Sequence, residues 1–164
     1  AKCKTFSILE KLCGRVRLDK AIDLVKRTRD FSEKVAILKA FKRMSIYRAD
    51  EWLFVFCDLS AYRSEAASQI MSVGVDFVAI GSKLNSESKV HVRLSKRFVE
   101  ELGINAGRDL VLALTRKFGG TGGGHKNLAT ITLNESLDQV FKFLLKFLKK
   151  SLKEKLGLDL IKME

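Results

Sequence analysis

The segment from Phe118 to Ala129 holds the residues whose types and spacing could do chemistry. Five of the chain's eleven glycines lie between positions 119 and 124, and His125, Lys126 and Asn127 follow directly. Glycine adopts positive φ without steric cost and lets backbone approach a ligand closely, so successive N–H groups can form an anion-binding concavity. The segment therefore predicts a site for a phosphate or a carboxylate. The alternative is a flexible hairpin tip.

Charge and composition narrow the class of partner. The chain has 164 residues, with 31 Lys and Arg against 19 Asp and Glu, a formal net charge of +12. Such an excess predicts an anionic partner, either nucleic acid or an acidic protein surface. The three cysteines share no CxxC spacing, so we expect reduced thiols and neither a disulfide framework nor a zinc site. No apolar run reaches bilayer length and no secretory signal is visible, which predicts a cytoplasmic protein.

Most of the excess charge lies in residues 1–50, which carry 14 basic and 6 acidic side chains. Apolar residues recur there at helical spacing, first around Leu18 to Val25 and again from Val35 to Met44. We therefore predict a basic helical appendage over 1–50. Its charges are expected to contact phosphates, among them Lys26, Arg27 and Arg29, although a solvated surface would explain part of the pattern.

Residues 51–134 alternate between strand and helix signals. Trp52 to Cys57 is an apolar run that predicts a buried strand, and Ala61 to Val73 predicts a helix that Gly74 ends. Further predicted elements are strands over 77–80, 90–92 and 128–133, a helical turn over 98–102, and a helix from 105 to 118. These make a mixed sheet flanked by helices, α/β or mixed α+β in class, within one domain over 51–164.

A long final helix is predicted from Glu135, with Asn134 as its cap. Its apolar positions recur at helical spacing, and lysines occupy the remaining positions. A basic amphipathic helix can lie on a membrane surface or pack on its own sheet. We favour packing on the sheet and expect no membrane contact.

Residues 52–133 resemble the DHH-associated C-terminal domain of RecJ-like exonucleases, oligoribonucleases and related phosphoesterases. The resemblance rests on Asp58-Leu59-Ser60-Ala61-Tyr62-Arg63, on Val90-His91-Val92-Arg93, and above all on the run from Gly119 to His125. It implies a domain that binds nucleic acid beside a separate metal-dependent cutting domain. A related glycine-rich domain closes alanyl-tRNA synthetases, where it contributes to tRNA binding and dimerisation, so a homodimer stays open.

The sequence lacks the Asp-His-His triplet of the cutting domain, and its only histidines are His91 and His125. Metal-dependent phosphodiester cleavage requires clustered carboxylates and imidazoles, which the scattered aspartates do not predict. We therefore expect no enzyme activity, no catalytic residue, no metal site and no cofactor. The chain is also similar to short archaeal RecJ DNA-binding-domain homologues associated with the GINS complex, which implies a role in DNA replication or repair.

The resemblance implies a binding site for single-stranded DNA or RNA. The N–H groups of Gly122, Gly123 and Gly124 are expected to contact a phosphate, with His125 donating a further hydrogen bond. Arg93 can form a fork onto a phosphate or stack on a base, unless it is a surface ion pair with Glu87 or Asp109. We expect His91 to be an ordinary strand residue, and Arg63 and Lys126 to add charge at the rim.

Two other functions stay open. One is a protein-interaction scaffold whose pocket is idle. The other is the substrate-binding subunit of a split DHH phosphoesterase, with the cutting domain supplied by another polypeptide.

Overall fold

The computed structural model describes residues 29–84 and 87–163. The chain divides into two compact units, residues 1–31 and 32–164. This division differs from the predicted boundary at 50/51, because the segment after Phe31 contributes a helix and a strand to the second unit. The helices predicted before residue 29, together with Lys26 and Arg27, lie outside the described residues.

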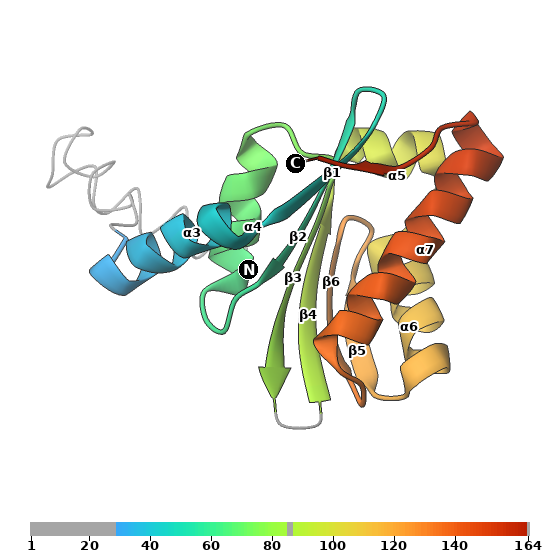
Figure 1. The fold of residues 1–164 in the computed structure, drawn as a ribbon. Helices are drawn as coiled ribbons and strands as arrows, with labels where there is room; N and C mark the ends of the chain where they lie inside the picture. Colours follow the sequence, from blue (N-terminus) through green and yellow to red (C-terminus); the bar gives the residue numbers. More distant parts are fainter. Residues whose placement is uncertain (1–28, 85–86, 164) are drawn as a thin grey trace, which may run out of the picture. The chain divides into compact units, whose positions relative to one another are not determined.

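The second unit alternates helices and strands along the chain (Figure 1). Its elements are α3 (Phe31–Arg43), β1 (Ser45–Ala49), β2 (Trp52–Asp58), α4 (Arg63–Ser72), β3 (Phe77–Leu84), β4 (Glu87–Leu94), α5 (Lys96–Leu102), a π-helical turn η1 (Ala106–Leu110), α6 (Val111–Phe118), β5 (Thr121–His125), β6 (Leu128–Leu133), α7 (Leu137–Leu156) and β7 (Ile161–Lys162).

The described strands form one seven-stranded mixed sheet in the order β5-β6-β4-β3-β2-β1-β7. The β2–β3 pair is parallel, and α4 makes the crossover between these two strands. The other pairs are antiparallel. The α/β fold class is therefore confirmed.

One face of the sheet carries the larger core. Aromatic residues of β2 and β3 pack there with Phe98 of α5, and the Trp52 ring meets the Phe98 ring edge-on at 6.1 Å. The Arg97 guanidinium lies 4.2 Å from the centre of the Trp52 ring, a cation–π contact. The helix α7 adds a buried stripe, which consists of Leu137, Val140, Leu144, Leu148 and Leu152. The predicted packing of this helix on the sheet is thus confirmed.

The opposite face of the sheet is covered along half its width. Val55, Cys57, Val78 and Ile80 of β2 and β3 pack there against α4 and α3, which Figure 1 shows on the side away from α7. The buried cluster on this side contains no residue of β4, β6 or β5. These three strands therefore present an uncovered surface beside α4.

The last helix begins later than predicted. Its N-cap is Ser136, which has an extended backbone, and the first helical residue is Leu137. Glu135 instead accepts a hydrogen bond from the Ser136 N–H at 2.7 Å. Residues 134–136 are used to turn the chain from β6 into the helix, so Asn134 is not the cap. Within the described part of the chain, no helix has both the length and the apolar character needed to cross a bilayer.

Candidate functional site

The glycine-rich segment is an edge strand and not a loop. Thr121–His125 forms β5, which pairs with β6 and is exposed at each residue. Positive φ occurs in this segment at Gly119 (69°) and Gly120 (96°), and not at Gly122, Gly123 or Gly124. The predicted concavity of three N–H groups is therefore wrong, because a strand turns successive N–H groups in opposite directions.

Close packing explains all but one glycine of this strand and its approach. A Cβ on Gly120 would lie 2.1 Å from the Thr132 carbonyl oxygen, and one on Gly124 would lie 2.0 Å from the Leu128 carbonyl oxygen. A Cβ on Gly122 would lie 3.0 Å from Ile131 Cγ2. Gly123 differs, since a Cβ there would meet nothing within 4 Å and its φ is not positive. Folding does not require glycine at this position.

Strand register places Gly123 in an ordered surface. Directly paired residues of antiparallel strands share a face, so β4, β6 and β5 present three rows of three positions, which we call the open face. The rows are Lys89, Thr132 and Thr121; His91, Thr130 and Gly123; and Arg93, Leu128 and His125. The open face has four nitrogen-bearing side chains, three hydroxyls and no carboxylate.

A hollow of about 270 Å³ lies where the start of α4 borders this surface. Its lining residues are Tyr62, Arg63, Ser64, Glu65, Lys89, His91 and Thr130. Arg63 donates to Ser82 Oγ at 2.8 Å, and Arg93 donates to Ser64 Oγ at 3.3 Å. These contacts fix both guanidinium groups beside one end of the open face. Tyr62 precedes the helix with φ of 53°, a left-handed conformation that non-glycine residues rarely adopt.

His91 is a member of the hollow that the sequence did not predict. It is 7% exposed, and its Nδ1 lies 3.0 Å from Thr130 Oγ1. Burial lowers its pKa to about 4, with the positive charges of Arg93 and Arg63 acting in the same direction. The imidazole is therefore neutral at pH 7. Its Nε2 is buried without a hydrogen-bond partner among the described residues, so it is available to a ligand.

Arg93 is also incompletely satisfied. Its Nε is buried and has no partner within the described residues. The alternative ion pair does not form, because Asp109 instead holds Arg108 at 2.7 Å and no described ion pair includes Arg93 or Glu87. Buried polar groups are normally hydrogen-bonded. Two neighbouring strand residues with unused buried nitrogens therefore mark this part of the sheet as prepared for a polar ligand.

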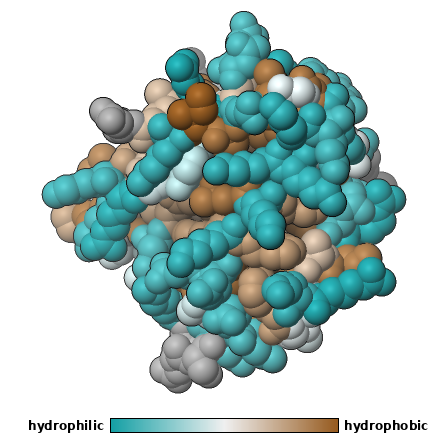
Figure 2. All heavy atoms as spheres, turned by 45° about the vertical axis from the view of Figure 1, so that its right-hand side comes forward, coloured by the Kyte–Doolittle hydropathy of each residue, from teal (hydrophilic) through white to brown (hydrophobic). Residues whose placement is uncertain are grey.

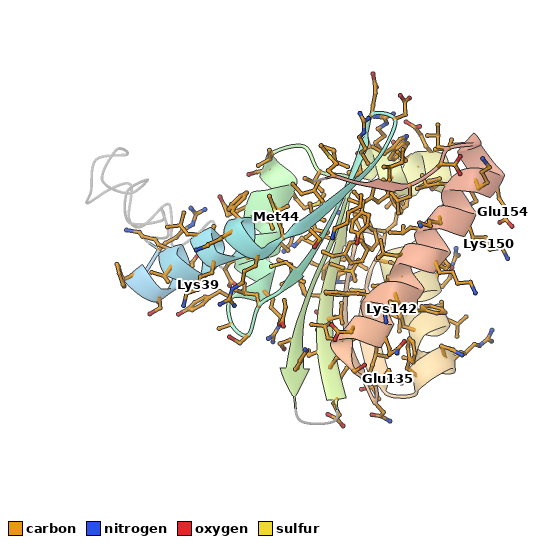
Figure 3. The ribbon with its side chains drawn as sticks, viewed as in Figure 1. Lys39, Met44, Glu135, Lys142, Lys150 and Glu154 are labelled. Atoms are coloured by element: carbon orange, nitrogen blue, oxygen red, sulfur yellow. The ribbon has the colours of Figure 1, made fainter. Side chains whose placement is uncertain are left out.

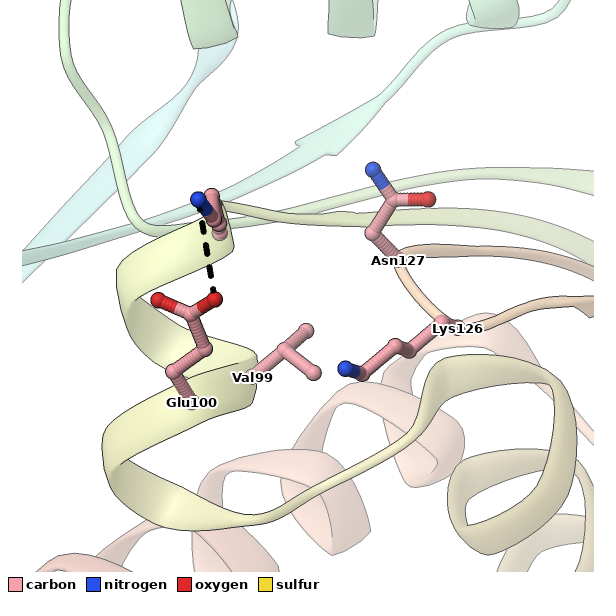
Figure 4. A pocket seen from close by; sticks show the side chains of 5 residues that line it. Val99, Glu100, Lys126 and Asn127 are labelled. Carbon is pink, nitrogen blue, oxygen red and sulfur yellow. Dashed lines mark ion pairs between the residues drawn. The ribbon is translucent and has the colours of Figure 1, made fainter.

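Lys126 lies apart from these residues. It lines a second hollow with Asn127 and residues of α5 (Figure 4). Lys96 and Glu100 form an ion pair at 3.7 Å on one side of this hollow, and Lys126 points toward Val99. The structure thus brings Arg63, Arg93, Gly123 and His125 to one surface but separates Lys126 from them. Within the described residues, no group of three His, Cys, Asp or Glu side chains could hold a metal ion.

The mixed sheet and its helices define a domain class found in DHH-type proteins. An exopolyphosphatase-related protein from Bacteroides fragilis superposes with a TM-score of 0.61 and 18% identity over 92% of this chain and 44% of that chain. The DHH domain of a member of a ribosomal protein family superposes with a TM-score of 0.54 and 12% identity, over 71% and 30% of the two chains. These likenesses concern the fold.

The family follows from the sequence match. Residues 63–154 match the DHHA1 domain, which is more than half of the chain. The chain therefore belongs to the DHHA1 domain family. An uncharacterized protein of Methanocaldococcus jannaschii is 29% identical over 127 residues, which cover 76% of this chain and 38% of that protein. The chain thus spans well under half the length of this relative.

Proposed function

We propose that the open face binds single-stranded nucleic acid through its phosphate backbone. The observation that carries this proposal is the row-by-row register of β4, β6 and β5, which collects cationic and hydroxyl side chains without a carboxylate. Neighbouring strands are about 4.8 Å apart, so the three strands span about 10 Å. That width suits one nucleic-acid strand better than a duplex.

Each part of the surface has a distinct chemical role in this proposal. The missing side chain at Gly123 lets a phosphate approach the backbone of the edge strand, and His125 next to it can donate to the same anion. Arg93 supplies a fixed charge and an unused Nε–H. Leu128, between Arg93 and His125 in its row, offers an apolar surface for one base.

His91 adds a neutral contact. If the Thr130 hydroxyl donates to Nδ1, the proton of the imidazole is on Nε2, and the ring then donates a hydrogen bond into the hollow. A neutral donor contributes direction without adding to the repulsion between Arg63 and Arg93. We expect DNA and RNA to be bound by the same contacts, since these contacts address the backbone.

We further propose that the chain binds without cutting, as an accessory subunit of RecJ type. Membership of a family associated with DHH proteins supports this step, and so does the absence of a ligand cluster for a metal among the described residues. The proposed partners are replication or repair proteins, with a GINS-like complex as the first to test. Co-elution of the purified chain with such a complex on size exclusion would support the assignment, and separate elution at micromolar concentration would contradict it.

The binding step is tested by fluorescence anisotropy with labelled single strands of about 12 nucleotides, as DNA and as RNA. Each neutralised phosphate adds about −0.7 to the slope of log affinity against log salt. Three or four cationic contacts on the open face therefore predict a slope of about −2 to −3. A flat salt response, or no binding at about 50 mM salt, would show that this surface does not hold a phosphate backbone.

The substrate-binding half of a split phosphoesterase is the second candidate. The observation in its favour is that the chain spans 38% of its relative from Methanocaldococcus jannaschii. Pull-down from an extract of the source organism distinguishes the two candidates. Recovery of a second polypeptide that confers metal-dependent cleavage would favour the split enzyme over the accessory subunit.

A further inference from the structure

A second basic surface lies on α7, on the side of the sheet opposite the open face. Four exposed lysines recur at spacings of four, three and four residues, and each lies about half a turn from the buried stripe of the helix; they are Lys142, Lys146, Lys149 and Lys153. Because an α-helix rises 1.5 Å per residue, these lysines form a straight row about 16 Å long that points away from the core. We call this row the lysine stripe.

Most of this charge is not neutralised by the protein. Lys153 pairs with Asp159 at 3.0 Å, and the adjacent Lys150 pairs with Glu154 at 3.7 Å. The other three lysines of the stripe have no ion pair within the described residues. Figure 3 labels Lys142, Lys150 and Glu154 along the helix. Three adjacent ammonium groups without a carboxylate are held together at some electrostatic cost.

The basic surface continues onto α6. Arg116 and Lys117 are exposed in the last turn of α6 and have no carboxylate partner among the described residues. The Phe118 ring contacts the Phe143 ring edge-on at 5.4 Å, which joins the end of α6 to α7 beside Lys142. Figure 2, which brings the α7 side forward, shows hydrophilic side chains over much of this surface. The two helices therefore form one cationic surface.

The chemistry of this surface selects among anionic partners. A membrane helix inserts its apolar face into lipid, but the apolar face of α7 is buried, and no large exposed apolar residue is on this helix. Protein interfaces are depleted in lysine and depend on buried aromatic or arginine anchors. The stripe consists of lysine on a convex helix, which fits a phosphate backbone contacted without sequence readout.

The shape of the surface further favours a duplex over a single strand. Duplex DNA carries one charge per about 1.7 Å of its axis, so a 16 Å row faces about nine phosphates, twice as many as a single strand offers. Single-strand sites also need aromatic platforms for unstacked bases, and the aromatic residues of α7 are half-buried against the core. We propose that the lysine stripe binds the backbone of duplex nucleic acid, independently of the open face.

The test uses a labelled random-sequence duplex of about 20 base pairs. One variant combines Lys142→Glu, Lys146→Glu and Lys149→Glu. The matched control combines Arg48→Glu, Lys83→Glu and Lys162→Glu, which change the net charge equally on exposed positions elsewhere. With about 0.9 per phosphate contact, the stripe variant should flatten the salt slope by about 2 to 3 and weaken duplex binding more than tenfold at about 50 mM salt. The control should lose less than threefold.

Several results would overturn the proposal. Equal losses in the stripe variant and the control would assign the effect to net charge. Binding of single strands but not of duplex by the wild type would remove the stripe and leave the open face intact. Loss of duplex binding in Arg93→Ala would place the duplex on the open face. Sedimentation with phosphatidylglycerol vesicles that only the stripe variant loses, at unchanged duplex affinity, would assign the stripe to lipid. Circular dichroism checks the fold, and Lys146→Gln with Lys149→Gln is the milder variant.

Discussion

Replacing Gly123 by alanine separates ligand approach from folding. The added methyl group meets no protein atom within 4 Å, and the backbone is not in the positive-φ region. The fold therefore accepts the change. Alanine also reduces the conformational freedom of the unfolded chain, so we expect the variant to gain about 0.4–1 kcal/mol in stability.

The same methyl group occupies the space through which a phosphate would reach the edge strand. A hydrogen bond to a charged group contributes about 1.5–3 kcal/mol, so its loss should weaken single-strand binding between about tenfold and 150-fold. Fluorescence anisotropy at about 50 mM salt measures this change. Thermal unfolding should show a midpoint about 1–3 °C higher. Weaker binding by a more stable protein is a combination that unfolding cannot produce.

Gly124→Ala is the contrasting variant, because its Cβ would lie 2.0 Å from the backbone oxygen of Leu128. Strand β5 must shift to accept it, so both stability and binding should fall. If Gly123→Ala instead binds as tightly as the wild type while its fold is retained, no ligand approaches this strand. The proposal that phosphate lies over the middle row of the open face would then be refuted.

Three further predictions follow from the same surface. Arg93→Ala should weaken single-strand binding tenfold or more by anisotropy, and Arg93→Lys should restore part of it, whereas Arg108→Ala on another surface should have little effect. The purified chain should not cleave a labelled single strand with magnesium or manganese; cleavage that survives further purification and is abolished by chelator would contradict this. Because the pKa of His91 is lowered to about 4 in the fold, the unfolded chain takes up the proton first. Stability should therefore fall as pH decreases from about 6.5 to 4. His91→Gln should lose less stability over that interval in chemical denaturation, and an identical decrease would refute the assignment.

Local pattern was sufficient for the elements that carry the core. The apolar run from Trp52 to Cys57 predicted β2 because a strand buried on both faces has no polar positions to interrupt it. The spacing of Leu137, Val140, Leu144 and Leu148 predicted α7 because the same side of a helix recurs at three and four residues. The sequence also identified the glycine-rich segment as the central feature of the site.

The conformation of that segment could not be predicted, because glycine has no side chain whose alternation would reveal a strand. Its packing depends on Gly107, where a Cβ would lie 2.6 Å from the backbone of Gly124. Only the folded chain shows that contact. The role of His91 was also missed, since its partner Thr130 is 39 residues away and the pair forms only when β6 joins β4.

The position of Trp52 gives the folded unit a built-in optical reporter. It is the chain's single tryptophan, it is 2% exposed, and it lies within residues 32–164. Its emission should shift to longer wavelength when the aromatic core opens and water reaches the indole. Intrinsic fluorescence therefore follows the unfolding of this unit alone, whatever residues 1–28 do, and needs neither a dye nor the protein concentrations of calorimetry.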